Sequence, residues 1–172
     1  MDLNALAREA HENAVAHGLW DEERPFAEIV GLIHSELSEA LEEYRDGHRL
    51  DEIYFTDEED PHRTPFTQFS PWLKPEGIPI ELADAMIRVL DLLEYKKVKI
   101  DQPGSGWMPI HVKDNMDTLP GFLAACHWLV SATYEDDWNT KYYYLKALLQ
   151  EISEFCQRVG IDLESALKIK MD

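Results

Sequence analysis

Four acidic residues stand in two pairs whose spacing would suit a metal site. The pairs are Glu36-x-x-Glu39 and Glu81-x-x-Asp84, and each lies inside an apolar run. In a helix, a spacing of three places both carboxylates of a pair on one face, about one turn apart. Two such helices that face each other would enclose a cage of four carboxylates. Hard oxygen ligands of this kind suit Mg²⁺ or Mn²⁺.

The position of these acids around their helices supports the same prediction. On a helical wheel, Glu36 falls within the apolar arc of its helix and Glu39 on the edge of that arc. Glu81 and Asp84 belong to a narrow polar stripe that apolar residues flank on both sides. A carboxylate that faces a core is costly unless a cation or a function offsets the cost. The alternative is a solvated carboxylate on a surface helix, which the wheel favours for three other acids: Glu42, Glu43 and Glu94.

The composition limits the classes of partner. The chain has 172 residues, 45% of them apolar, which suits one domain with a proper core. Its 34 acidic and 16 basic residues give a net charge of −18, which argues against a nucleic-acid polymer or a membrane surface as partner. A small polyphosphate stays compatible with this charge if metal ions supply positive charge locally.

Cysteine usage and hydropathy bear on the compartment. Cys126 and Cys156 lie in apolar, helix-like runs without a CxxC motif, which predicts free buried thiols in a reducing cytoplasm. No apolar run approaches the roughly 18 residues of a membrane span, and no signal peptide is visible. We therefore expect a cytoplasmic protein.

The hydrophobic periodicity predicts an all-α fold, a helical bundle that forms one domain over residues 1–172. Its metal-site half would span residues 3–99 and its second helical half residues 119–171. No strand is predicted, and residues 48–79 and 102–119 are expected to be irregular. The helices are expected over residues 3–17, 26–46, 80–99, 120–134, 140–159 and 163–171.

A weak internal repeat relates the two halves. Residues 119–127 (LPGFLAACH) echo residues 26–34 (FAEIVGLIH), and residues 159–162 echo residues 98–101. At this alignment the second copy lacks the acids, since Leu129, Tyr142 and Leu145 stand at the positions of Glu36, Glu81 and Asp84. The alternative is a chance likeness, because amphipathic helix pairs resemble each other.

The order of these motifs resembles the MazG-like all-α nucleoside triphosphate pyrophosphohydrolases, most closely their short phage and bacterial members. The likeness is carried by Glu36-x-x-Glu39, by residues 74–84 (KPEGIPIELAD), and by the flanking residues 13–45 and 160–168. It covers residues 3–97 and 160–171. Residues 98–159 would then be an insertion that adds a helix pair before the C-terminal helix.

The resemblance implies hydrolysis of a nucleoside triphosphate between the α and β phosphates, which gives a nucleoside monophosphate and pyrophosphate. It implies that Glu36, Glu39, Glu81 and Asp84 are the catalytic residues that bind Mg²⁺, with Mn²⁺ as an alternative. Family members often carry another Glu before the first pair, where this chain has Ser35. Either of two other acids is a candidate to substitute for it: Glu43 or Asp91.

The resemblance also implies substrate contacts. In related dCTP pyrophosphatases a His and a Trp nine residues apart contact the base, and His11 and Trp20 stand at that spacing. The alternative for Trp20 is a ring that caps the core of the bundle. Arg88 would either bind a phosphate or neutralise the acids of its own stripe. An aromatic residue occupies the Arg88 position in the dCTP-type relatives, so the base preference is left open.

Two other functions and two states of assembly are considered. A di-iron or di-manganese bundle is disfavoured because no His follows any of the four acids by three residues. A catalytically degenerate module that binds a nucleotide or a protein stays open. The family and the two-sided apolar character of the Glu81 helix favour a homodimer or larger assembly. Closure of the bundle within one chain is the alternative.

Overall fold

The computed structural model describes residues 1–57, 59–60, 64–70, 72–100, 116–134 and 137–171. These residues are mostly helical, which confirms the all-α class. The helices begin and end close to their predicted bounds, except that α3 stops at Tyr95 rather than near Lys99. Most of the predicted loop over residues 102–119 lies outside the described residues. The elements, in chain order, are α1 (Leu3–Ala16), α2 (Phe26–Arg45), β1 (Tyr54–Thr56), β2 (Lys74–Glu76), α3 (Ile78–Tyr95), α4 (Leu119–Ala132), α5 (Trp138–Val159) and α6 (Leu163–Met171).

The prediction of no strand is wrong for one short stretch. Strands β1 and β2 pair antiparallel, with Tyr54 opposite Glu76 and Thr56 opposite Lys74. Strands of three residues are too short to show a periodicity, and a proline such as Pro75 disfavours a central strand. Proline is tolerated here because β2 is an edge strand, whereas β1 also bridges to Phe66 through Phe55. The hairpin ends directly at the first turn of α3.

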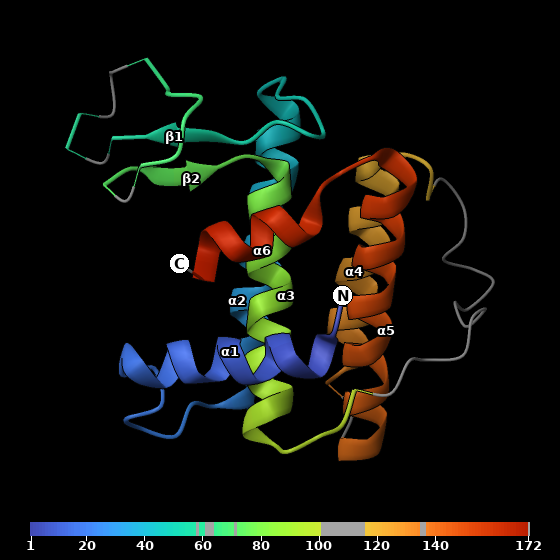
Figure 1. Cartoon of the computed structure of the whole chain (residues 1–172). Coiled ribbons are helices and arrows are strands. Elements are labelled where there is room, and N and C mark those ends of the chain that lie inside the picture. The colour runs from blue at the N-terminus through green and yellow to red at the C-terminus, as the bar shows by residue number, and fades with distance from the viewer. Residues whose placement is uncertain (58, 61–63, 71, 101–115, 135–136, 172) are drawn as a thin grey trace.

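Helix α3 lies at the centre of the fold (Figure 1). Helix α2 packs along it, α1 and α6 cross it, and the α4–α5 pair completes the layer beside α2 and α3. Apolar side chains cover α3 nearly all round, since Ile80, Leu82, Met86 and Leu90 are fully buried. A helix that is enclosed in this way leaves a narrow polar stripe, as the wheel predicted. No described helix is both long and apolar enough to cross a bilayer.

Gly77 fixes the junction between the hairpin and α3. Its φ of +114° is a conformation that L-residues with a side chain rarely adopt. A Cβ atom at this position would collide with the backbone carbonyl oxygen of Glu52. The close approach holds the segment before β1 against the start of α3, where Glu81 lies in the first turn.

We predict that Gly77→Ala destabilises the protein by more than about 1 kcal/mol. Alanine would be strained at this φ, and its methyl group would collide with the carbonyl oxygen of Glu52. The matched control is Gly31→Ala in the middle of α2, where an added Cβ meets nothing within 4 Å. That change should be neutral or stabilising by up to about 1 kcal/mol, as expected for a helix interior. Urea unfolding monitored by circular dichroism measures both variants. Equal effects would contradict the role given to Gly77.

Candidate functional site

The structure brings three of the four predicted acids together. Glu36 and Glu39 of α2 and Glu81 of α3 each offer a carboxylate oxygen, and these atoms lie within 4.8 Å of one another. Glu36 and Glu81 are only 6% and 4% exposed, whereas Glu39 lies on the exposed rim. The acids meet because α2 and α3 pack side by side, with the acidic edge of each helix facing the other. We call Glu36, Glu39 and Glu81 the carboxylate cluster.

Asp84 lies beside this cluster and pairs with a cation. The Nζ atom of Lys170, on α6, lies 2.8 Å from Oδ2 of Asp84. The charge of Asp84 still contributes to raising the pKa of Glu81, so the two carboxylates sense each other. Asp84 is therefore a fourth acid at the edge of the cluster rather than a member of it.

Arg88 neutralises the other end of the site. Its Nε and Nη2 atoms both donate to Oε1 of Glu36, at 2.9 and 2.8 Å. Arg88 thus occupies the acid stripe as predicted, and its partner is the acid on the neighbouring helix. Ser35, at the position where an additional family acid would stand, donates its hydroxyl hydrogen to Oε1 of Glu39 at 2.8 Å. The serine therefore orients a member of the carboxylate cluster.

The chain neutralises this acidic site incompletely. Burial, followed by the charges of Asp84, Glu39 and Glu36, raises the pKa of Glu81 to about 8. Burial also raises the pKa of Glu36, although the bond from Arg88 opposes it. The pKa of Asp84 is raised by burial against the opposing effect of Lys170. Desolvated carboxylates at this density are the donor set that a divalent cation with oxygen ligands fits.

The β1–β2 hairpin adds polar groups that the sequence did not identify. Tyr54 donates its hydroxyl hydrogen to Glu43, whose two carboxylate oxygens lie 3.0 and 3.1 Å from the hydroxyl. Glu43 is thus half-buried and bonded, which corrects its prediction as a solvated side chain. Lys74 pairs with Glu76 at 2.9 Å and also interacts electrostatically with Glu81 and Glu39. Lys74 stands in the sequence run that precedes Glu81. Only the folded hairpin brings its side chain near the carboxylate cluster.

His11 and Trp20 meet at one carboxylate, that of Asp91 on α3. The Nδ1 atom of His11 lies 2.7 Å from Oδ1 of Asp91, and Nε1 of Trp20 donates to both oxygens at 2.9 and 3.1 Å. Trp20 also stacks on Tyr95, with ring centroids 3.8 Å apart. The structure therefore brings His11 and Trp20 together, but both side chains contact the carboxylate of Asp91. Tyr95 covers one face of the Trp20 indole. Neither Asp91 nor Glu43 stands free to replace the acid missing at position 35.

A groove of about 240 Å³ lies beside Asp91. Arg88 and Lys170, the two cations that pair with Glu36 and Asp84, line it together with Asp91. The groove runs between α1, α3 and α6, and we call it the α1–α3 groove. It is lined by Ala10, Asn13, Ala14, His17, Leu19, Ile87, Arg88, Asp91 and Lys170.

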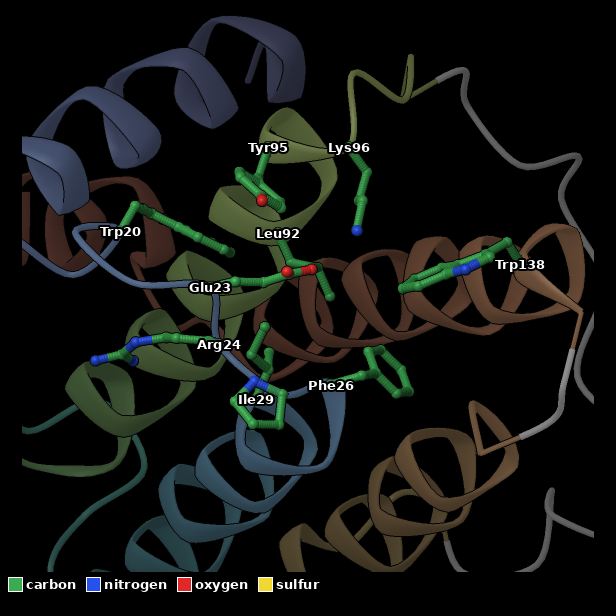
Figure 2. Close-up of a pocket in the computed structure, with 10 residues that line it drawn as sticks. Trp20, Glu23, Arg24, Phe26, Ile29, Leu92, Tyr95, Lys96 and Trp138 are labelled. Atoms are coloured by element: carbon green, nitrogen blue, oxygen red, sulfur yellow. The ribbon is translucent and has the colours of Figure 1, made fainter.

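A second cavity of about 310 Å³ lies further along α3. Figure 2 shows Trp20 and Tyr95 on one side of it, Phe26 and Trp138 on the other, and Lys96 reaching between them. The Nζ atom of Lys96 lies 4.7 Å from the ring centroid of Trp138, within cation–π range. Tyr95 follows Glu81 by almost four turns, roughly 20 Å at the helical rise of about 1.5 Å per residue. This aromatic cavity is therefore separate from the carboxylate cluster.

Comparison of the chain with known protein families, curated proteins and solved structures gives no match.

We predict that millimolar Mn²⁺ or Mg²⁺ raises the melting temperature, because a bound cation relieves repulsion among the buried carboxylates. Glu36→Gln should remove most of this rise. The matched control is Glu42→Gln on the exposed face of the same helix, which should keep it. Differential scanning calorimetry with and without metal measures the effect. A melting temperature that Mn²⁺ leaves unchanged would count against the metal site.

We also predict a pH dependence of stability that comes from Glu81. Its pKa is about 8 in the folded chain against an ordinary 4.5, so the folded state binds the proton more tightly. The resulting stabilisation is present at low pH and is lost as the pH rises through about 8. The melting temperature should therefore fall from about pH 5 to about pH 8.5 more steeply in the wild type than in Glu81→Gln. Parallel curves for the two proteins would refute this.

Proposed function

We propose that the chain is a metal-dependent nucleoside triphosphate pyrophosphohydrolase. It would break the acid anhydride between the α and β phosphates and release a nucleoside monophosphate and pyrophosphate. The observation that carries the proposal is the convergence of Glu36, Glu39 and Glu81 within 4.8 Å at the junction of two helices. The order of motifs that resembles the MazG-like family supports the same activity.

Glu36, Glu39 and Glu81 would hold Mg²⁺ or Mn²⁺, with Asp84 as the fourth ligand candidate. The bound ion would neutralise phosphate oxygens and lower the pKa of a water molecule. The donor set fits such an ion because it consists of carboxylates, two of them nearly fully buried.

Two cations at the mouth of the α1–α3 groove are suited to bind the phosphates. Arg88 presents a planar guanidinium that matches phosphate geometry, and it lies 2.8 Å from Glu36. Lys170 adds a second positive charge beside Asp84. A metal ion that takes over these two acids would leave both cations available for the substrate. Lys74 supplies a further charge on the rim near Glu81.

The α1–α3 groove would then hold the nucleoside. Arg88, Lys170 and Asp91 line it, so phosphates bound by these two cations would place the sugar and base between α1 and α3. The carboxylate of Asp91 accepts hydrogen bonds only, and its bonds from His11 and Trp20 fix its orientation. Trp20 and His11 therefore act on the base through Asp91 in this proposal.

The compartment and partners follow from charge and thiols. We place the reaction in the cytoplasm, because Cys126 and Cys156 are free and buried, as suits a reducing environment. The net charge of −18 speaks against a nucleic-acid polymer or membrane partner and for a small substrate whose charge the metal offsets.

A second candidate function is nucleotide binding without turnover. The aromatic cavity favours it, since Trp20, Phe26, Tyr95 and Trp138 line it together with two cations, Arg24 and Lys96, and one acid, Glu23. Rings and a cation of this kind suit a planar, anionic ligand, and they need no metal ion.

The test is pyrophosphate release from a panel of canonical and modified nucleoside triphosphates, with Mg²⁺, with Mn²⁺ and with EDTA. We expect metal-dependent release, and we expect Glu81→Gln to lower it by roughly 100-fold or more, the scale on which loss of one electrostatic stabiliser acts. Glu42→Gln is again the matched control. Substitution of Asp91 by Asn should change the order of preference among the bases.

Two outcomes would reject this proposal. Release that persists in EDTA or in Glu81→Gln would exclude the carboxylate cluster as its source. No release, together with nucleotide binding in EDTA that Trp138→Ala abolishes, would establish the binding module instead.

A further inference from the structure

Helices α2 and α4 bury their side chains in the same pattern. A constant shift of 93 residues, as from Ile29 to Phe122, carries each buried residue of α2 onto a buried residue of α4 or its C-terminal cap. This is the shift that the sequence predicted from residues 26–34 and 119–127. The buried residues of α2 are Ile29, Val30, Ile33, Glu36, Leu37 and Ala40, and their counterparts are Phe122, Leu123, Cys126, Leu129, Val130 and Thr133.

Helices α3 and α5 show a weaker relation at a shift of 63 residues, as from Leu82 to Leu145. Each buried residue of α5 falls on a buried residue of α3, whereas the other buried residues of α3 fall on partly exposed positions of α5. The sequence had suggested an alignment that differs by two, which would set Leu145 against the partly exposed Asp84. Burial favours the shift of 63 over that alignment, and at this shift Tyr144 and Ala147 correspond to Glu81 and Asp84. The buried residues of α5 are Leu145, Leu148, Leu149, Ile152, Phe155 and Cys156, which match Leu82, Ala85, Met86, Val89, Leu92 and Leu93.

The positive-φ residues that close α3 and α5 coincide at this shift. Lys97 and Gly160, which the shift equates, both adopt positive φ, at 55° and 81°. In each case the next amide returns to the helix over 2.9 Å, from Val98 to Leu93 and from Ile161 to Cys156. Helices α1 and α2 end in the same way, at Gly18 and Gly47, so this termination fits the shift but does not by itself identify α3 and α5 as copies.

One pair of equivalent residues touches. His34 of α2 and His127 of α4 are related by the shift of 93, and their Nδ1 atoms lie 2.8 Å apart. Their rings are parallel within 10°, with centroids 5.1 Å apart. In a symmetric dimer, a residue that contacts its own equivalent lies on the two-fold axis. The two helix pairs therefore face each other as two subunits would.

We propose that α4–α5 is a second copy of α2–α3 that has lost its acids and takes the place of a partner subunit. The positions of Glu36, Glu39, Glu81 and Asp84 are occupied in this copy by Leu129, Ala132, Tyr144 and Ala147. Leu129 is fully buried, so the copy carries apolar packing where the first pair carries the cluster. The apolar face of α2 that a second chain would cover is covered by α4. One chain is then the complete unit, with one carboxylate cluster, whether or not the cluster hydrolyses nucleotides.

The first test is multi-angle light scattering over a range of concentrations, with and without Mn²⁺. We expect the mass of one chain, 19.9 kDa, throughout. Isothermal titration with Mn²⁺ should show one tight site per chain that Glu81→Gln weakens, because the second copy has no carboxylates at the equivalent positions. A dimer at micromolar concentration would overturn the proposal, as would a second tight Mn²⁺ site in each chain.

The second test is a double-mutant cycle across the pseudo-axis. His34→Ala and His127→Ala should shift the urea midpoint by amounts that do not add in the double variant, because the two rings touch. A matched control pairs His34→Ala with His17→Ala at the exposed C-cap of α1, where the shifts should add. Additive shifts for His34 and His127 would mean that α4 is not the partner of α2. In that case the face of α2 that carries His34 would be available to the α2 helix of another chain.

Discussion

The structure depends on the desolvation of carboxylates between α2 and α3. Glu36 and Glu81 lie almost wholly out of water, within reach of each other and of Glu39. Such burial opposes folding unless positive charge approaches. The fold brings that charge from elements far apart in the sequence, with Arg88 on α3 and Lys170 on α6. The arrangement therefore stores an unfavourable electrostatic energy in the place where a cation would release it.

The surrounding elements can be understood as supports for this arrangement. The fully buried apolar side chains of α3 hold its polar stripe in one direction, and α1 and α6 cross it so that Asp91 and Asp84 both find donors. The hairpin closes the other end through Gly77 and brings Lys74 to the rim. Each of these elements places one or two polar groups around a helix that is otherwise core.

The parts of this site that the sequence could predict are those fixed by local periodicity. Spacing along α2 and α3 placed Glu36, Glu39 and Glu81 on facing edges, because a regular helix converts sequence separation into direction. The pairing of Lys170 with Asp84 depends on how α6 docks, and no local pattern encodes that. The convergence of His11 and Trp20 on Asp91 likewise needs three segments to meet. The short β1–β2 pair was missed because three-residue strands carry no period. The alignment of the two halves that the sequence suggested differs by two from the one we propose, because it rested on similar residues after the helices and not on burial.

The contact between α2 and α4 has a consequence for how this protein can change. In a homodimer every substitution is made twice, once in each subunit, so a residue that improves packing at one copy of an interface is imposed on the other. Here the two faces are encoded separately, by Glu36 on one side and Leu129 on the other. The apolar side can gain cohesion by mutation without altering the acidic side. A chain built in this way can hold an energetically costly site on a bundle whose remaining half is free to evolve for stability alone.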